Sequence, residues 1–183
     1  MSRTFSRLGV LLAATLALSL SACAAPPASA PAPTPHPYAG ADFSVDADAT
    51  DVGLPVFPGA RLQSPHNGDD KPALNLSIWG GTLGLRVAVI KLRSDAPIAD
   101  VAAFYRRAMA RRGPWRDCAR PGAASAPGAG PDCSKSEIPR GGFLFKAGVD
   151  DEEVRTVALS PHDEGGVQIQ LVRVAFGREA ALR

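Results

Sequence analysis

The fold is decided by residues 74–92, which read LNLSIWGGTLGLRVAVIKL. Apolar residues occupy every second position from Leu74 to Ile78, and the alternation resumes from Leu83 to Val89. A period of two is typical of a half-buried strand. Gly80-Gly81 separates the two runs, and glycine tolerates the positive φ that a tight turn demands. The stretch therefore predicts a β-hairpin.

An amphipathic helix is expected after the hairpin. Ala96-Pro97 can open it, because proline at an early helical position loses no hydrogen bond, and Gly113-Pro114 can end it. Apolar residues recur between these points at helical spacing, with Asp100, Arg107 and Arg111 on the opposite side. The apolar stripe comprises Ile98, Val101, Ala102, Tyr105, Ala108 and Met109.

Further strands are expected on both sides of this unit. A short one is predicted at 60–63, and three more at 143–147, 154–159 and 167–176. The polar runs at 150–153 and 163–166 then serve as hairpin loops. In the last strand the apolar residues change phase after Leu171, which predicts a β-bulge there.

This order of elements predicts an α+β fold of two layers. We expect an antiparallel sheet of about five or six strands, with one amphipathic helix packed on one face. The single domain should span 42–177, and 178–183 should form a C-terminal tail.

The N-terminus has the pattern of an export signal. Arg3 and Arg7 precede an uncharged apolar run from Leu8 to Leu20, which is shorter than the roughly 20 residues of a transmembrane helix. The run ends in Leu20-Ser21-Ala22-Cys23, which resembles the bacterial lipobox. A secretory signal cleaved elsewhere is the alternative, and it would leave Cys23 an ordinary thiol.

The lipobox resemblance implies that the signal peptide 1–22 is removed and that Cys23 receives a diacylglyceryl thioether. The protein would then be anchored in the bacterial cell envelope, with membrane lipid as a partner through Cys23. Ala24 follows the cysteine where an aspartate would signal retention, which resembles the signal for transfer to the outer membrane, facing the periplasm.

A Pro/Ala-rich segment follows the expected anchor. Residues 23–41 favour extended polyproline II and cannot bury a core, so we interpret them as a tether. At about 3.1 Å per residue the tether reaches some 50 Å. A docking role for the prolines is the alternative.

Removal of the leader also changes the charge balance. The whole chain has 20 Lys+Arg and 18 Asp+Glu, and the leader contains two arginines and no acid, which leaves 18 of each. A neutral balance gives no reason to expect a nucleic-acid partner.

The two remaining cysteines, Cys118 and Cys133, form an even pair in an oxidising compartment. The residues between them are mostly small and could let the ends meet, so we predict a disulfide. Two free thiols or a redox pair are the alternatives, although redox pairs normally have the closer C-x-x-C spacing.

Two stretches resemble a group of uncharacterised bacterial secreted and lipoprotein domains. LPVFPGA at 54–60 resembles their L-P-x-[YF]-P-G-A opening, and DAPIADVAAFY at 95–105 resembles their V-x-x-F-Y helix. The resemblance covers about 52–116 and implies architecture only, because no activity is known for these domains. Phe57 stands where tyrosine is commoner. We interpret Phe104, Tyr105 and Trp115 as core residues, with ligand stacking as the alternative.

The search for chemistry yields no catalytic residue, no cofactor and no metal site. Metal-binding spacing is absent among His36, His66 and His162. His66 with Asp69 and Asp70, and the carboxylates at 150–153, are each better explained as solvated loops. No nucleophile motif is present.

A run of arginines is the remaining feature. Arginine stands at 106, 107, 111, 112, 116 and 120, and cations near a helix C-terminus interact favourably with the helix dipole. The alternative is a patch, with Arg107 and Arg111 at its centre, that binds phosphate-bearing lipid heads or an acidic envelope protein.

These patterns favour a non-enzymatic accessory protein of the envelope, which acts in binding or assembly and has an envelope protein as its partner. The alternative is a periplasmic enzyme or small-ligand sensor with a site built from dispersed residues, and a deep polar pocket would favour it. A purely structural spacer would have neither pocket nor patch.

Overall fold

The computed structural model describes residues 39–63, 71–120 and 130–177. The predictions for Cys23, for the signal peptide, for most of the tether and for His66, Asp69 and Asp70 lie outside these residues. The described part belongs to one compact unit, 36–183. No helix within it is both long and apolar enough to cross a membrane.

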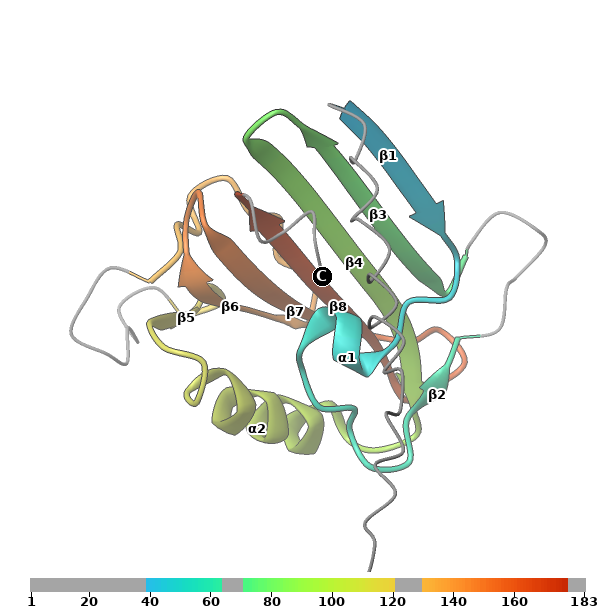
Figure 1. The fold of residues 1–183 in the computed structure, drawn as a ribbon. Helices are drawn as coiled ribbons and strands as arrows, with labels where there is room; N and C mark the ends of the chain where they lie inside the picture. Colours follow the sequence, from blue (N-terminus) through green and yellow to red (C-terminus); the bar gives the residue numbers. More distant parts are fainter. Residues whose placement is uncertain (1–38, 64–70, 121–129, 178–183) are drawn as a thin grey trace, which may run out of the picture. The chain divides into compact units, whose positions relative to one another are not determined.

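An antiparallel sheet dominates the domain (Figure 1). Its strands follow the order β1-β3-β4-β8-β7-β6-β5, and β2 pairs with β4 beside this path. The strands are β1 (Ala39–Ser44), β2 (Arg61–Leu62), β3 (Ala73–Gly80), β4 (Leu83–Ser94), β5 (Trp115–Asp117), β6 (Phe143–Val149), β7 (Glu153–Pro161) and β8 (Val167–Phe176).

The α+β class with an antiparallel sheet agrees with the prediction, but the predicted number of strands was too low. The sheet has eight strands rather than five or six. The two unexpected ones are β1 and the three-residue β5. A second helix, α1 (Ala49–Val52), accompanies the expected one, α2 (Ile98–Met109).

The predicted hairpin is present as β3 and β4. The strands pair from Ala73 with Ile90 to Gly80 with Leu83. The turn is therefore Gly81-Thr82, one residue later than expected, and Gly81 has a φ of 58°.

Helix α2 packs on one face of the sheet, which we call the helix face. Its predicted stripe is buried except for the half-buried Ile98, and Val101, Tyr105 and Met109 are fully buried. These side chains join Ile90, Phe145 and Ile169 of the sheet in one core. Phe57, Phe104 and Tyr105 form edge-to-face ring contacts, with Phe57 to Phe104 centroids 5.3 Å apart and Phe104 to Tyr105 centroids 5.0 Å apart.

The bulge predicted near Leu171 is absent. Strand β8 pairs without interruption with β4 and with β7, and Leu171 itself lies opposite Ile90 and Val157. The apolar residues change phase because the strand runs past the helix-covered core. Beyond Leu171 the helix face carries Arg173, and the apolar Val172 and Val174 point to the other face.

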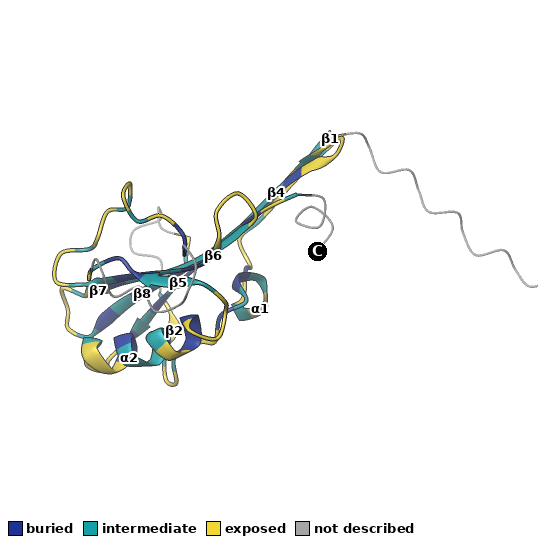
Figure 2. Cartoon of the chain, turned by 90° about the vertical axis from the view of Figure 1, so that its left-hand side faces the viewer, coloured by how far each residue is buried: buried dark blue, intermediate teal, exposed yellow. Residues whose placement is uncertain are grey.

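That other face lacks a helix over the described strands β1, β3, β4 and β8. We call its apolar part the open face; further along β4 and β8 the same side carries Lys91 and Gln170. In Figure 2 both helices lie on one side of the sheet, and the end containing β1 and the β3–β4 turn extends beyond them. Its side chains align in cross-strand rows. They are Phe43, Leu74, Leu76, Ile78, Leu85, Val87, Val89, Val172, Val174 and Phe176.

At the opposite edge the same side of the sheet is partly covered. Lys146 Nζ donates to the carbonyl oxygen of Asp132 at 2.7 Å, and Arg116 Nε donates to that of Gly130 at 3.1 Å. The segment that contains Cys133 therefore lies over strands β5 and β6, and Leu144 beneath it is buried.

Candidate functional site

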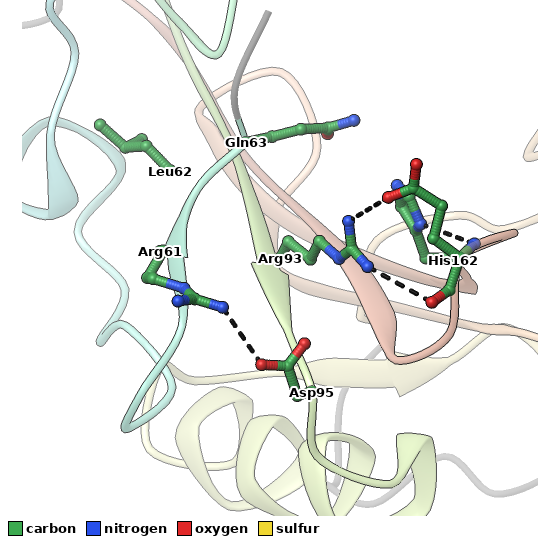
Figure 3. A pocket seen from close by; sticks show the side chains of 7 residues that line it. Arg61, Leu62, Gln63, Arg93, Asp95 and His162 are labelled. Atoms are coloured by element: carbon green, nitrogen blue, oxygen red, sulfur yellow. Dashed lines mark hydrogen bonds and ion pairs between the residues drawn. The ribbon is translucent and has the colours of Figure 1, made fainter. Parts of the chain in front are cut away.

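A polar pocket lies between β2, the end of β4 and the β7–β8 loop (Figure 3). It has a volume of about 460 Å³. Its lining consists of Arg61, Leu62, Gln63, Arg93, Asp95, His162 and Glu164.

The charges of the polar pocket neutralise one another. Arg61 Nη2 lies 3.1 Å from Asp95 Oδ2, and each side chain is 74% exposed. Arg93 Nη1 lies 2.6 Å from Glu164 Oε2. Because its walls are solvated ion pairs, the pocket is an open polar depression rather than the deep site that would favour a small-ligand enzyme.

His162 is the one imidazole in this pocket, and its hydrogen bond limits its chemistry. Its Nδ1 accepts from the backbone N–H of Glu164 at 3.2 Å. A neutral imidazole that accepts at Nδ1 carries its proton on Nε2, which leaves Nε2 as a hydrogen-bond donor. The residues that line the pocket include no serine, threonine, cysteine or lysine to serve as a nucleophile.

An arginine–carboxylate network occupies the helix face where α1 covers it. Asp51 pairs with Arg86, while Glu153 Oε1 lies 2.7 Å from Arg155 Nη2 and 2.5 Å from Arg173 Nε. Arg173 Nη1 also donates to the carbonyl oxygen of Asp51 at 3.3 Å. Three guanidinium groups thus share two carboxylates.

Helix α1 positions Asp51 for this network. The Asp48 side chain accepts from the backbone N–H of Thr50 and Asp51, and Asp51 Oδ2 accepts from the N–H of Asp48 at 3.0 Å. This reciprocal capping box stabilises a helix of only four residues and directs the Asp51 carboxylate toward Arg86. The capping bonds also lower the pKa of Asp48.

Arg155 lies in an environment that disfavours its positive charge. Burial lowers its pKa below the ordinary arginine value, Glu153 opposes that effect, and Arg173 and Arg112 lower the pKa further. Its Nε is buried and has no hydrogen-bond partner among the residues that the structure describes. The network therefore carries more positive charge than its carboxylates balance.

The arginines of the predicted basic run take different roles. Arg106 is structural, because its guanidinium lies over the rings of Phe143 and Phe145, at 5.1 and 5.4 Å, and Nε lies 3.4 Å from buried Asp117. Arg107 and Arg111 are exposed, as an anion-binding patch requires. Binding by these two residues stays a prediction.

The predicted cysteine pair is brought together. Cys118 and Cys133 lie at disulfide-bonding distance, with Sγ atoms 1.96 Å and Cα atoms 5.6 Å apart.

The carboxylates at 150–153 take different partners: Asp150 accepts from the N–H of Asp132, and Glu153 belongs to the arginine network. Within the described ranges, no group of three or more His, Cys, Asp or Glu side chains could hold a metal ion.

Sequence reasoning missed Arg155 and Arg173. Arg155 is separated by an even number of residues from the core residues Val157 and Leu159 and so lies on their face of β7. Arg173 lies in the same way on the face of Leu171 in β8. A charged residue at a core position of an alternating strand is a detectable signal for an inward-facing charge. Asp51, which joins Arg86 and Arg173 to the network, is distant from both in sequence, so the whole network could not be inferred.

Comparisons with models of known protein families, with curated proteins and with solved structures found no match.

Proposed function

We propose that this protein is an envelope-anchored lipoprotein whose domain binds another envelope protein through the open face, as a non-enzymatic accessory. The observation that carries the proposal is the uncovered apolar face. Phe43 is 65%, Ile78 43% and Phe176 49% exposed, whereas Ala88, Ile90 and Leu92 on the helix face are at most 3% exposed.

The size of the open face supports an interaction. Four strands at about 4.8 Å spacing and three side-chain rows about 6.6 Å apart give roughly 400 Å². Soluble monomers rarely leave a contiguous apolar patch larger than a few hundred Å² uncovered, and such patches mark interaction sites.

The free edge of β1 favours a protein as the partner. Within the described residues β1 pairs only with β3, so its outer edge offers a row of backbone donors and acceptors. The strand Ala39–Ser44 contains no proline or lysine to prevent further pairing. A strand of a partner protein can add there, and it would extend the sheet and with it the open face.

The charges near the open face argue against a lipid surface. Asp150, Asp151 and Glu152 are exposed in the β6–β7 turn, at the same end of the sheet as the β3–β4 turn. Anionic lipid would repel these carboxylates. A protein partner with an apolar strand meets no such cost.

The test is crosslinking in intact cells, followed by reconstitution of the purified pair. Ile78→Lys places a charge on the open face and should abolish the adduct with the partner. Leu62→Lys is the matched control, because Leu62 is 55% exposed but lies on β2 outside that face. Both variants should melt like the wild type.

Two outcomes would overturn the proposal. One is an adduct that survives Ile78→Lys, which would place the contact elsewhere. The other is an adduct that contains only two copies of this chain, which would make the open face a dimer interface.

A further inference from the structure

An open groove lies on the helix side of the domain, between the C-terminal ends of α1 and α2. It has a volume of about 530 Å³. Thr50 and Gly53 come from the α1 side, and Arg111 and Arg112 follow α2. The rest of the lining is apolar and consists of Ala49, Leu54, Pro55 and Ala108.

The two arginines of the groove are available to a ligand. Both are exposed, and neither guanidinium forms an ion pair or hydrogen bond with the described residues. Their backbone N–H groups already bond the carbonyls of Ala108 and Met109, which holds the chain after α2 in a fixed course. The guanidinium groups are therefore not needed to cap the helix.

A third guanidinium lies behind the wall of the groove. A Cβ built on Gly53 would lie 3.0 Å from Arg155 Nε and 3.1 Å from Arg155 Nη2. Glycine at this position thus leaves only backbone between the groove and Arg155. Since Arg155 Nε is buried without a partner, negative charge in the groove would be stabilised from below as well as from the rim.

The surrounding charges leave a positive surplus. Among the described residues, Arg86, Arg155 and Arg173 pair with Asp51 and Glu153, and Asp48 caps α1 beside them. With Arg111 and Arg112 of the groove, five guanidinium groups stand beside these three carboxylates. The surplus of two matches the charge of a phosphate monoester near neutral pH. The planar guanidinium fork also fits phosphate oxygens in pairs.

We infer that this groove binds a phosphate group, either from a lipid headgroup or from a free phosphate compound. Arg111 and Arg112 contact the phosphate, Arg155 contributes charge from behind Gly53, and the apolar wall accepts the carbon part of the ligand. The inference concerns the opposite face from the proposed protein contact, so either can fail alone.

The test uses the full chain with Cys23→Ala, so that the expected anchor does not itself bind membrane. Inorganic phosphate is titrated by calorimetry. Vesicles of phosphatidylcholine, with and without phosphatidic acid, are tested by sedimentation. Saturable phosphate binding identifies a free phosphate source, and binding only to vesicles with phosphatidic acid identifies a lipid headgroup.

Arg111→Ala/Arg112→Ala should weaken the binding at least about tenfold, as the loss of charge-assisted hydrogen bonds does. Arg140→Ala is the matched control, because Arg140 is exposed but does not line the groove. The melting temperature should not change in either variant. Absence of binding in both arms, an unaffected double variant, or an equal loss in Arg140→Ala would overturn the inference.

Discussion

At Gly53 the backbone and a neighbouring charge both restrict the residue type. Its φ is 63°, in the left-handed region, and it forms the C-cap of α1 by donating to the carbonyls of Ala49 and Thr50. Any side chain there would also press on the guanidinium of Arg155.

Gly53→Ala should therefore destabilise the domain by more than the backbone cost alone. The left-handed conformation costs a non-glycine residue about 1–2 kcal/mol, and displacement of Arg155 adds to it. Gly59→Ala is the matched control, because Gly59 has a φ of 79° and an added Cβ meets nothing within 4 Å. Urea unfolding measures both variants. Equal losses of stability would show that Arg155 moves aside without cost.

Burial of Tyr105 makes the stability of the domain depend on pH. Its side chain is fully buried, and burial raises its pKa far above the ordinary value of 10.0. The nearby backbone N–H of Phe57 only partly offsets this effect, and the hydroxyl lacks a hydrogen bond of normal geometry among the described residues.

The folded-state pKa of Tyr105 is raised. Its contribution to the free energy of unfolding is therefore complete below pH 10 and is lost as the pH rises above 10. Above pH 10 the unfolded chain releases the phenolic proton and the folded chain retains it. Tyr105→Phe should remove this part of the alkaline decline and cost little at pH 7. Tyr105→Ala should cost about 3–5 kcal/mol. A Tyr105→Phe variant whose unfolding free energy falls as steeply as the wild type's above pH 10 would contradict the assignment.

At the scale of elements, the hairpin and the helix were predictable because each is encoded locally. Alternation from Leu74 to Val89 and the stripe from Val101 to Met109 each repeat a signal within one element. The alternation did not reveal which face of the hairpin is covered. Val87 and Val89 share a face as predicted, yet Ala88 and Ile90 on the other face are the residues that join the core.

The missed elements are short or depend on distant partners. Strand β1 reads AGADFS, without a run of β-branched residues, and exists through pairing with β3. Strand β5 has three residues and pairs with β6, some thirty positions later. The open face and the arginine–carboxylate network also arise only from assembly: Asp51 reaches Arg86 and Arg173 across three elements.

A disulfide between Cys118 and Cys133, which are 15 positions apart, closes a loop. Closing a loop of this length should stabilise the domain by about 3 kcal/mol in the chain-entropy model. We expect Cys118→Ala/Cys133→Ala to lower the melting temperature accordingly, and dithiothreitol to lower that of the wild type equally. Thiol titration of the unfolded, unreduced wild type checks the bond itself. Reactive thiols at both Cys118 and Cys133 would refute it.

At the scale of the whole molecule, the two faces of the sheet differ in chemistry. The helix face combines an apolar core under α2 with a surplus of arginine under α1, whereas the open face is apolar and gives way to Lys91 and Arg93 only further along β4. Because β1 begins at Ala39, the expected tether joins the domain at the edge of the open face. A chain anchored at Cys23 would keep the open face within the tether's reach, about 50 Å, of the envelope surface.

The anchor itself is tested by metabolic labelling with a tagged fatty acid. We expect label on the wild-type protein and none on Cys23→Ala, because the lipobox resemblance makes Cys23 the acylated residue. Cys118→Ala/Cys133→Ala is the control, and it should be labelled like the wild type because the thioether requires only Cys23. Label should also partition with the outer-membrane fraction, since Ala24 follows the cysteine. A labelled Cys23→Ala protein would remove the anchor, and with it the reason to place the open face at the membrane.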